Sequence, residues 1–474
     1  MTAIRFAPRF PALLLILCGA LGACTVGPDY RRPAAPTPAA FKETEGWVPA
    51  QPSDAADRRD WWAVFGDPVL NGLETQVESS NQTLAAAEAA YRQARASVRE
   101  QRAALFPTVS LGGAANAAGG GFANAPAGTS SSYSLLLGAT WEPDLWGRVR
   151  RSVESARATA QVSAADLANA RLSAQTELAV DYIQLRQIDE EKRILGDTAR
   201  GYARSLAIAQ NRYRAGVVAR SDVFAAQTQL ATVQADDADL VQQRARLEHA
   251  IAILAGRPPA DLALAPAPWS PRLPEIPPGL PSTLLERRPD IAAAERQVAA
   301  ANAQIGVQAA AYYPSLTLSG QAGFAAGGLG GLFSASNLLW SVGASAAQTL
   351  FDAGARHARV DEARAARDQA VANYRQTVLT AFGQVEDNLA AQRVLTGEQV
   401  LRQGALAAAN ANEAVARNQY LAGLTDYTTV VVAQAAALAA RTSDLQVQAA
   451  RLTVAVDLIA ALGGGWKAEQ LPRP

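Results

Sequence analysis

The residues that most often carry out chemistry are scarce in this sequence. Only two histidines and two cysteines occur among 474 residues, which is too few for most metal sites. His249 and His357 are both flanked by helix-forming residues, and the acidic run 189–191 is typical of a solvated helix face. The stretch 327–333 begins like a dinucleotide-binding loop, but Phe333 stands where the last glycine is required. The sequence therefore predicts no enzyme, no metal site and no cofactor.

The overall composition argues against a partner that is a nucleic acid. Lys and Arg together number 43, and so do Asp and Glu, whereas a nucleic-acid binder normally shows a basic excess. Hydrophobic residues make up 49% of the chain but aromatic residues only 6%, so alanine and the small aliphatic residues must supply most of the burial. A chain of this length could form two or three ordinary domains.

Cys24 has the clearest chemistry of any single residue. Arg5 and Arg9 precede an apolar run at 10–20 that has the length of a signal peptide and is too short to span a bilayer. The run ends in Leu-Gly-Ala-Cys at 21–24, which resembles a bacterial lipobox. We expect residues 1–23 to be removed as a signal peptide and Cys24 to become the lipid-attached first residue. A plain secretory signal with a chance cysteine is the alternative.

Two neighbouring residues refine this prediction. Cys18 would leave with the signal peptide, so the mature chain could form no internal disulfide. Thr25 follows Cys24, whereas an aspartate at that position usually implies retention in the inner membrane of bacteria. This start therefore predicts an outer-membrane lipoprotein.

The elements that follow occur twice. Landmark residues recur with a constant separation of 207 positions: Pro107 and Pro314, Gly147 and Gly354, Gly216 and Gly423, Gln227 and Gln434, and Gly256 and Gly463. Chance similarity between alanine-rich segments could not hold one register over such a length. The chain therefore contains an internal duplication.

Each copy is predicted to contain a helix, two strands and two longer helices, in that order. Proline ends the first helix, because its ring blocks helix continuation. The first helices are expected at about 73–105 and 284–311, and the strands at about 108–118, 132–141, 315–325 and 338–350. The long helices are expected at 149–213 and 355–420, and the return helices at 221–254 and 427–462.

The long helical stretches predict rods without a globular core. Leu195, Tyr202, Leu206, Ala209 and Tyr213 follow heptad spacing. About 65 residues at 1.5 Å each give a rod of roughly 100 Å. The abundant alanines predict close packing between helices. Taken alone, the helices would fit an ordinary soluble coiled coil.

The strands favour a membrane instead. Each has about the length of a tilted membrane strand. Aromatic residues mark their ends, as at the headgroup level of a membrane barrel: Phe106, Trp141, Trp146, Tyr312 and Tyr313 at one end, and Phe122, Phe324 and Phe333 toward the other. Four strands cannot close a barrel in lipid, because known single-chain barrels begin at about eight. Several chains must then share one barrel, and three chains supply twelve strands and a tube of twelve helices.

Several motifs resemble signatures of one family, the TolC-like outer-membrane factors, in the lipoprotein (NodT/OprM-like) branch. They are "CTVGPDY" from Cys24, "DWWAVFGDPVLNGL" at 60–73, "ERRPDIAAAERQ" at 286–297, "AFGQVEDNLA" at 381–390 and the two Tyr-x-Ala-Gly turns. The resemblance runs from Cys24 to about Gly465.

The resemblance implies a mainly α fold with a small transmembrane β part, assembled as a homotrimer. Its 12-stranded outer-membrane β-barrel would continue as a 12-helix periplasmic α-barrel. Residues 67–256 and 284–463 would be the two repeats, and segments 24–66, 257–283 and 464–474 would form an equatorial belt. The implied function is the exit duct of a drug efflux pump, supplied by an inner-membrane RND-type transporter through a periplasmic adaptor. The alternative is a lipid-anchored periplasmic coiled-coil adaptor.

The resemblance also implies a gate at the periplasmic tips, where Gly216 and Gly423 permit tight reversals. Tyr420 matches the family's tip tyrosine and Asp222 the aspartate that it commonly bonds. We therefore expect a hydrogen bond between them in the closed state. Asp222 could instead take part in a helix N-terminal cap with Ser221.

The tip also departs from the family pattern. Val432 stands where many members carry an aspartate that contributes to an acidic ring, and Thr429 occupies the position that corresponds to Asp222. Asp426 is the remaining acid at this turn. A charged ring favours cations, so its loss or displacement predicts a more hydrophobic constriction.

Overall fold

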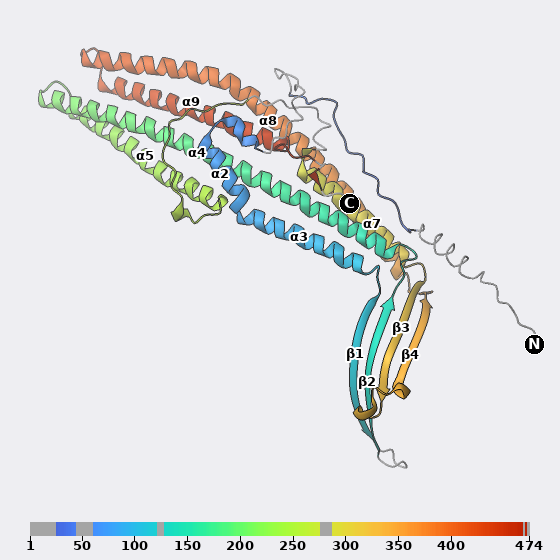
Figure 1. Cartoon of the computed structure of the whole chain (residues 1–474). Coiled ribbons are helices and arrows are strands. Elements are labelled where there is room, and N and C mark those ends of the chain that lie inside the picture. Colours follow the sequence, from blue (N-terminus) through green and yellow to red (C-terminus); the bar gives the residue numbers. More distant parts are fainter. Residues whose placement is uncertain (1–24, 44–59, 121–127, 275–286, 468–469, 472–474) are drawn as a thin grey trace, which may run out of the picture.

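The computed structural model describes residues 25–43, 60–120, 128–274, 287–467 and 470–471 (Figure 1). The predicted signal peptide, Cys24 and Phe122 lie outside the described residues. The described part is an elongated assembly of helices with one small sheet at its end. No described helix is long and apolar enough to cross a membrane.

The duplication is visible in the helix lengths. The short helices α3 (Gln82–Ala103) and α7 (Pro289–Ala310) have 22 residues each. The long helices α4 (Arg148–Arg214) and α8 (Ala355–Leu421) have 67 residues each, and the return helices α5 (Arg220–Leu254) and α9 (Tyr427–Ala461) have 35. At 1.5 Å per residue the long helices reach about 100 Å. In the described ranges the connections contain four short 3₁₀ helices: η2 (Trp61–Phe65), η3 (Pro259–Asp261), η5 (Leu329–Gly331) and η6 (Ala335–Asn337).

The first expected helix is in fact two helices. Asn81 separates α2 (Pro68–Ser80) from α3, so the prediction of one helix over 73–105 is wrong. The Asn81 carboxamide oxygen accepts the Leu84 N–H at 3.0 Å, and its nitrogen donates to the Leu254 carbonyl at 2.8 Å. An N-cap asparagine satisfies a backbone donor that a new helix would otherwise leave free. Asn81 thereby also fixes α3 to the end of α5.

One antiparallel sheet joins the two copies. Its strands β1 (Thr108–Gly120), β2 (Gly128–Trp141), β3 (Ser315–Ala326) and β4 (Leu338–Ala347) lie in sequence order (Figure 1). β4 ends three residues earlier than expected, and β2 begins four residues earlier. Within the described chain β1 and β4 each pair on one side only, so both edges of the sheet are open.

The register gives the sheet one apolar face. Residues directly opposite in an antiparallel pair point to the same face. One row across the four strands is Leu111, Leu137, Ala322 and Trp340; the flanking rows on that face are Val109, Ala139, Gly320 and Val342, and Gly113, Leu135, Phe324 and Leu338. The opposite face carries rows such as Ser110, Gly138, Gln321 and Ser341. The apolar face is solvent-exposed in the single chain, with Trp340 73% and Val342 81% accessible.

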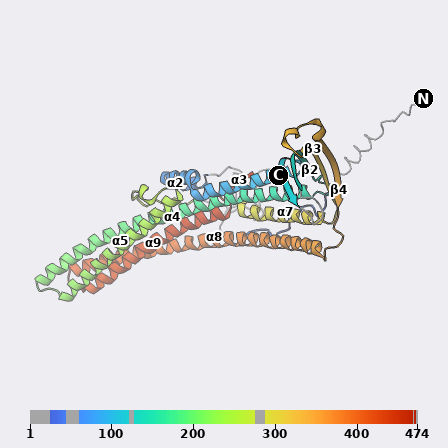
Figure 2. The same ribbon diagram turned by 90° about the horizontal axis from the view of Figure 1, so that it is seen from below.

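The helices run side by side away from the sheet and end in two hairpin tips (Figures 1 and 2). α4 packs along α5, α7 and α9, and α8 packs along α7 and α9. The main core lies at mid-length, where α2, α4, α8 and α9 bury Leu70, Leu178, Leu185, Tyr374, Leu389 and Leu458. Of the expected heptad positions, Leu195, Tyr202 and Ala209 are buried, whereas Tyr213 is 43% exposed.

Candidate functional site

Both tips are Schellman turns built around glycine. After α4, the Gly216 N–H donates to the Tyr213 carbonyl at 2.9 Å and the Val217 N–H to the Arg212 carbonyl at 2.9 Å. The same pair of bonds follows α8, around Gly423. The φ angles of the two glycines are +73° and +77°, the left-handed region that suits a residue without Cβ. A Cβ on Gly216 would meet nothing within 4 Å, so the requirement there is conformational.

Arg212 connects the two tips of the protomer. Its Nη1 donates to the Tyr420 carbonyl at 2.7 Å, and its guanidinium lies 4.6 Å from the centre of the Tyr420 ring. The Tyr420 ring also packs against Tyr427, with ring centres 5.3 Å apart. Ala209, Val223, Ala226 and Val430 complete this small core. The contacts join α4 and α5 to α8 and α9 directly above the turns.

The hydrogen bond expected between Tyr420 and Asp222 is not formed in this structure. The Tyr420 hydroxyl is buried and has no partner among the described residues. Burial raises the pKa of Tyr420, and the neighbouring Arg212 charge opposes that rise. Tyr420 is held through its ring and its carbonyl instead. Sequence reasoning missed Arg212, although it directly precedes the first Tyr-x-Ala-Gly turn.

Asp222 is not an N-cap, and Asp426 is one. The cap position of α5 is Ala219, without a side-chain hydrogen bond, and Asp222 lies half-buried in the first turn, where an acidic charge suits the helix dipole. Asp426 caps α9: its Oδ1 accepts from the Thr429 N–H at 2.9 Å and from the Thr429 hydroxyl at 2.8 Å. These two bonds lower the pKa of Asp426. Both acids therefore remain beside the turns.

Val432 stands at the position where the family resemblance implies an acid. It is 64% exposed on α9. Other large apolar side chains are exposed around the two turns: Val217, Phe224, Leu421 and Leu424. In the single chain, the surface near both turns is thus rich in uncovered apolar groups.

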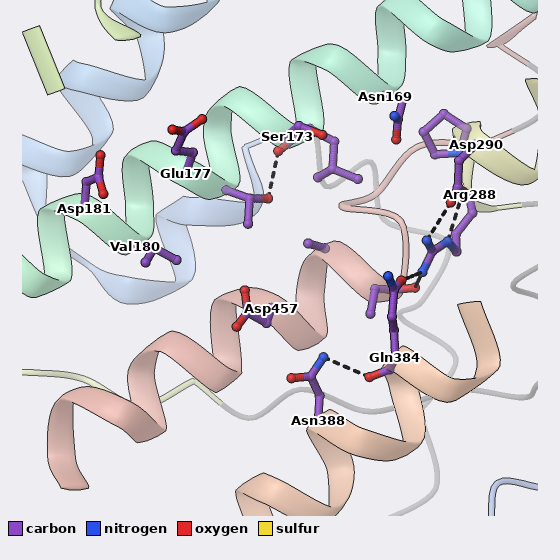
Figure 3. A pocket seen from close by; sticks show the side chains of 15 residues that line it. Asn169, Ser173, Glu177, Val180, Asp181, Arg288, Asp290, Gln384, Asn388 and Asp457 are labelled. Carbon is purple, nitrogen blue, oxygen red and sulfur yellow. Dashed lines mark hydrogen bonds and ion pairs between the residues drawn. The ribbon is translucent and has the colours of Figure 1, made fainter. Parts of the chain in front are cut away.

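The "RRPD" motif has a structural role at the other end of the hairpins. Arg288 is buried at the start of α7 and donates to Asp290, to Gln384 of α8 and to the carbonyl of Ala461, at the end of α9. Figure 3 shows these bonds at one side of a polar pocket of about 540 Å³. A guanidinium suits this task because its five donors lie in one plane. One side chain thereby fastens three helices.

The same pocket is lined by several carboxyl groups, but they do not form a metal site. Glu177, Asp181 and Asp457 line it from α4 and α9 (Figure 3). Burial, reinforced by the charge of Glu177, raises the pKa of Asp181 to about 6. Among the described residues no group of three or more His, Cys, Asp or Glu side chains could hold a metal ion.

The segment after Cys24 is fastened close to the sheet. The Val26 N–H donates to the Trp146 carbonyl at 3.0 Å, and Arg151 Nη2 donates to Asp29 at 2.9 Å. Gly27 lies so close to Gly306 that a Cβ would come within 2.4 Å of the Gly306 Cα. Close approach of two backbones thus explains the glycine in "CTVGPDY".

An open-edged sheet with one apolar face, continued by helices about 100 Å long, defines the class of outer-membrane channel proteins with a periplasmic helical part. The chain belongs to the outer membrane efflux protein family, whose model matches residues 73–257 and 280–464. The two matched segments correspond to the two copies of the repeat.

Similar proteins span almost the whole chain. The Pseudomonas putida probable efflux pump outer membrane protein TtgC is 32% identical over 94% of this chain and 93% of its own. The Pseudomonas aeruginosa pyoverdine export outer membrane protein OpmQ is 32% identical over 96% and 97%. The solved outer-membrane channel OprN superposes with a TM-score of 0.87 at 34% identity, covering 94% of this chain and all of that one. The open state of the Neisseria gonorrhoeae channel MtrE gives 0.84 at 29%, covering 94% and 99%.

These comparisons confirm the predicted family, the duplicated mainly α fold with four strands and the function as an efflux channel of the outer membrane. The protein is not an enzyme and belongs to a family that needs no cofactor. The alternative of a periplasmic coiled-coil adaptor is wrong. That alternative rested on the helices alone, and it left the strands unexplained.

Proposed function

We propose that three copies of this chain close one barrel and one helical tube, through which small organic molecules such as drugs leave the cell. The observation that carries this proposal is the pair of open edges, β1 and β4, on a sheet with one apolar face. In lipid an unpaired strand edge leaves backbone groups without partners, so the edges must be covered. Pairing β1 of one copy with β4 of the next covers them all and makes twelve strands.

A lipid on Cys24 is the second part of the proposal. Thr25, the next residue, lies against Gly147, which separates the sheet from α4. A lipid attached one residue earlier would therefore start at the level where the strands meet the helices. The aromatic residues Trp146 and Tyr313 stack at that same level, with ring centres 4.9 Å apart, as suits a membrane interface.

The belt is the third part. Trp269 in the segment after α5 donates to Gln448 of α9 at 2.9 Å, and Arg186 of α4 donates to the Ala265 carbonyl at 2.7 Å. The segment 257–274 thus crosses the outside of the helices near mid-length. We assign it, with 464–474 and the part of 24–66 that follows the sheet-bound residues 25–29, to a collar around the tube.

The gate is the fourth part. Its elements are the turns at Gly216 and Gly423, Tyr420 with Arg212 beneath it, and the acids Asp222 and Asp426. A periplasmic adaptor, coupled to an inner-membrane RND-type transporter, would bind these tips and shift a closed state toward an open one. Without an acid at Val432 the constriction would be apolar rather than charged.

A purified sample tests the assembly. We expect a heat-modifiable, SDS-resistant trimer in outer-membrane fractions. After reconstitution into planar bilayers, this trimer should form a continuous pore. Cys24→Ser should remove labelling by radioactive palmitate and leave the trimer intact. A stable, pore-less monomer in detergent would overturn the shared barrel. Co-purification of the inner-membrane partner would identify the pump.

A further inference from the structure

Four arginines form a stripe along one face of α3. They are three, four and three residues apart, and this spacing keeps them on one side of the helix over about 15 Å: Arg92, Arg95, Arg99 and Arg102. All four side chains are exposed, and within the described ranges none of them forms an ion pair. α3 ends at Ala103 and β1 begins a few residues later, so the stripe runs toward the sheet (Figures 1 and 2).

Acidic side chains on α3 do not cancel this charge. Glu88 shares the face of the stripe, but it lies one turn before Arg92, at the end farther from the sheet. Glu100 lies about 100° around the helix from Arg99. Neither acid forms an ion pair with the stripe in the part of the chain that the structure describes. The end of the stripe nearest the sheet therefore keeps its positive charge.

The duplication shows which way the stripe faces. At the corresponding positions, 207 further on, α7 carries uncharged residues: Ala299, Asn302, Gly306 and Ala309. The segment 25–30 covers that face of α7, because Asn302 Nδ2 donates to the Pro28 carbonyl at 2.8 Å and Gly27 lies against Gly306. This segment follows the proposed lipid on Cys24, so it runs on the outer side of the helices. The stripe on α3 therefore faces outward as well, away from the interior of the proposed tube.

The stripe also lies clear of the helices on either side of α3. α3 packs along α4, and its half-buried residues mark the side that meets α4: Tyr91, Ala94, Val98 and Gln101. Each arginine of the stripe comes one position after one of these residues, which turns it by about 100° around the helix. In the proposed ring the next copy lies opposite α4, so the stripe faces neither neighbour.

The end of the stripe lies close to the membrane boundary. Arg99 precedes β1 by nine residues, as Gly306 precedes β3, so the two residues lie at similar levels along the tube. Gly306 lies against Gly27, three residues after Cys24, and three residues of chain span at most about 11 Å. Arg99 and Arg102 are therefore within about 11 Å of the level at which the proposed lipid would enter the membrane. An arginine can extend its guanidinium toward headgroups while its stem lies along the protein.

We propose that the arginine stripe binds anionic phospholipid headgroups of the periplasmic leaflet. Arginine suits a lipid phosphate because its planar donors can bind two oxygens at once. The occupant is a lipid surface rather than an acidic protein, because the stripe leads directly to the strand that enters the membrane. Attraction to an anionic surface falls off within about 8 Å at physiological salt, so Arg99 and Arg102 should carry most of the binding. Each copy of the repeat would then have its own attachment to the leaflet, through the lipid on Cys24 beside α7 and through charge on α3.

The direction and level of the stripe rest on the proposed barrel and lipid anchor, so its test must not depend on pore formation. Native mass spectrometry of the full chain in detergent, titrated with phosphatidylglycerol or with phosphatidylcholine, counts the lipids bound to each assembly that forms. The first phosphatidylglycerol should bind at least about fivefold more tightly than the first phosphatidylcholine, and raised salt should reduce that preference. A chain that stays monomeric would count against the shared barrel, whereas equal binding of the two lipids would overturn the role of the stripe alone.

Matched variants locate the lipid binding. Arg99→Gln with Arg102→Gln should weaken phosphatidylglycerol binding by at least about fivefold and leave phosphatidylcholine binding unchanged. Arg214→Gln with Arg220→Gln removes the same charge at the periplasmic tip and should leave the binding of both lipids unchanged. All four side chains are exposed, so both variants should fold, and thermal unfolding checks this. The proposal is overturned if both pairs weaken phosphatidylglycerol binding alike. It is also overturned if the α3 pair lowers only the stability of the trimer, because a second copy of the chain would then cover the stripe.

Discussion

Arg212 holds Tyr420 by its carbonyl and by its ring face, at 2.7 Å and 4.6 Å, across 208 positions of sequence. The contact joins the last turn of α4 to the last turn of α8. Any outward movement of one hairpin tip relative to the other must break it. It is therefore the polar contact in the protomer on which we expect the resting tip to depend most.

Replacement of Arg212 should favour the open tip. Arg212→Ala removes a stacking contact and a charge-assisted hydrogen bond, together about 2–3 kcal/mol per protomer. That shifts a two-state equilibrium by more than about tenfold, so single-channel conductance in planar bilayers should rise. Arg212→Lys should be intermediate, since an ammonium keeps the charge but not the planar stack. Arg214→Ala is the control and should conduct like wild type, because Arg214 lies two residues away and donates to Asn211 of its own helix.

Two substitutions of Tyr420 distinguish a tip held closed by the tyrosine ring from a tip held closed by its hydroxyl group. The hydroxyl has no partner among the described residues, so Tyr420→Phe should leave conductance close to wild type. Tyr420→Ala removes the ring that Arg212 and Tyr427 contact and should raise conductance. A large rise with Tyr420→Phe would instead restore the hydrogen bond to Asp222 as the closing contact.

The glycine turns should tolerate a side chain less well than glycines inside the same helices. Gly216→Ala and Gly423→Ala place a Cβ on a residue with positive φ, at a cost of about 1–2 kcal/mol. Gly397→Ala and Gly404→Ala, in the interior of α8 where a Cβ meets nothing within 4 Å, should stabilise by up to about 1 kcal/mol. Thermal unfolding followed by helical circular dichroism compares the two pairs. Equal destabilisation of all four variants would contradict the conformational argument.

The features that the sequence predicted correctly are those that depend on the positions of proline and glycine. The 207-residue period, the strands and the tip turns follow from proline and glycine, which act through local geometry. Two features of the tip could not be predicted in this way. Arg212 meets Tyr420 only after both hairpins have packed, and the Tyr420 hydroxyl is buried without a hydrogen-bond partner among the described residues. The helix break at Asn81 did have a local signal, because asparagine is a preferred N-cap residue.

Because Val432 is uncharged, we expect the constriction to select cations less strongly than it would with an acid at this position. If the tips meet at a constriction, Val432→Asp in three copies creates an acidic ring, which attracts cations by its local potential. The reversal potential in a KCl gradient should shift toward that of potassium. Val241→Asp, exposed on α5 well away from the turns, carries the same charge and should leave the reversal potential unchanged. An equal shift in both variants would show that overall charge, not position 432, is responsible.

Glu74 should make the protein less stable as the pH rises. It is fully buried in α2, neither carboxyl oxygen has a partner in the described part of the chain, and burial raises its pKa to about 9. In the unfolded chain it ionises near about 4.3. Between these two pKa values the folded state binds more protons than the unfolded state. The free energy of unfolding is therefore highest below the unfolded-state pKa of Glu74 and falls as the pH rises toward the folded-state pKa. Glu74→Gln should match wild type at about pH 4 and melt at a higher temperature at about pH 8, by an amount equivalent to at least about 1 kcal/mol. Glu88→Gln, exposed on α3, should show no such pH-dependent gain, and a gain of equal size there would contradict burial as the cause.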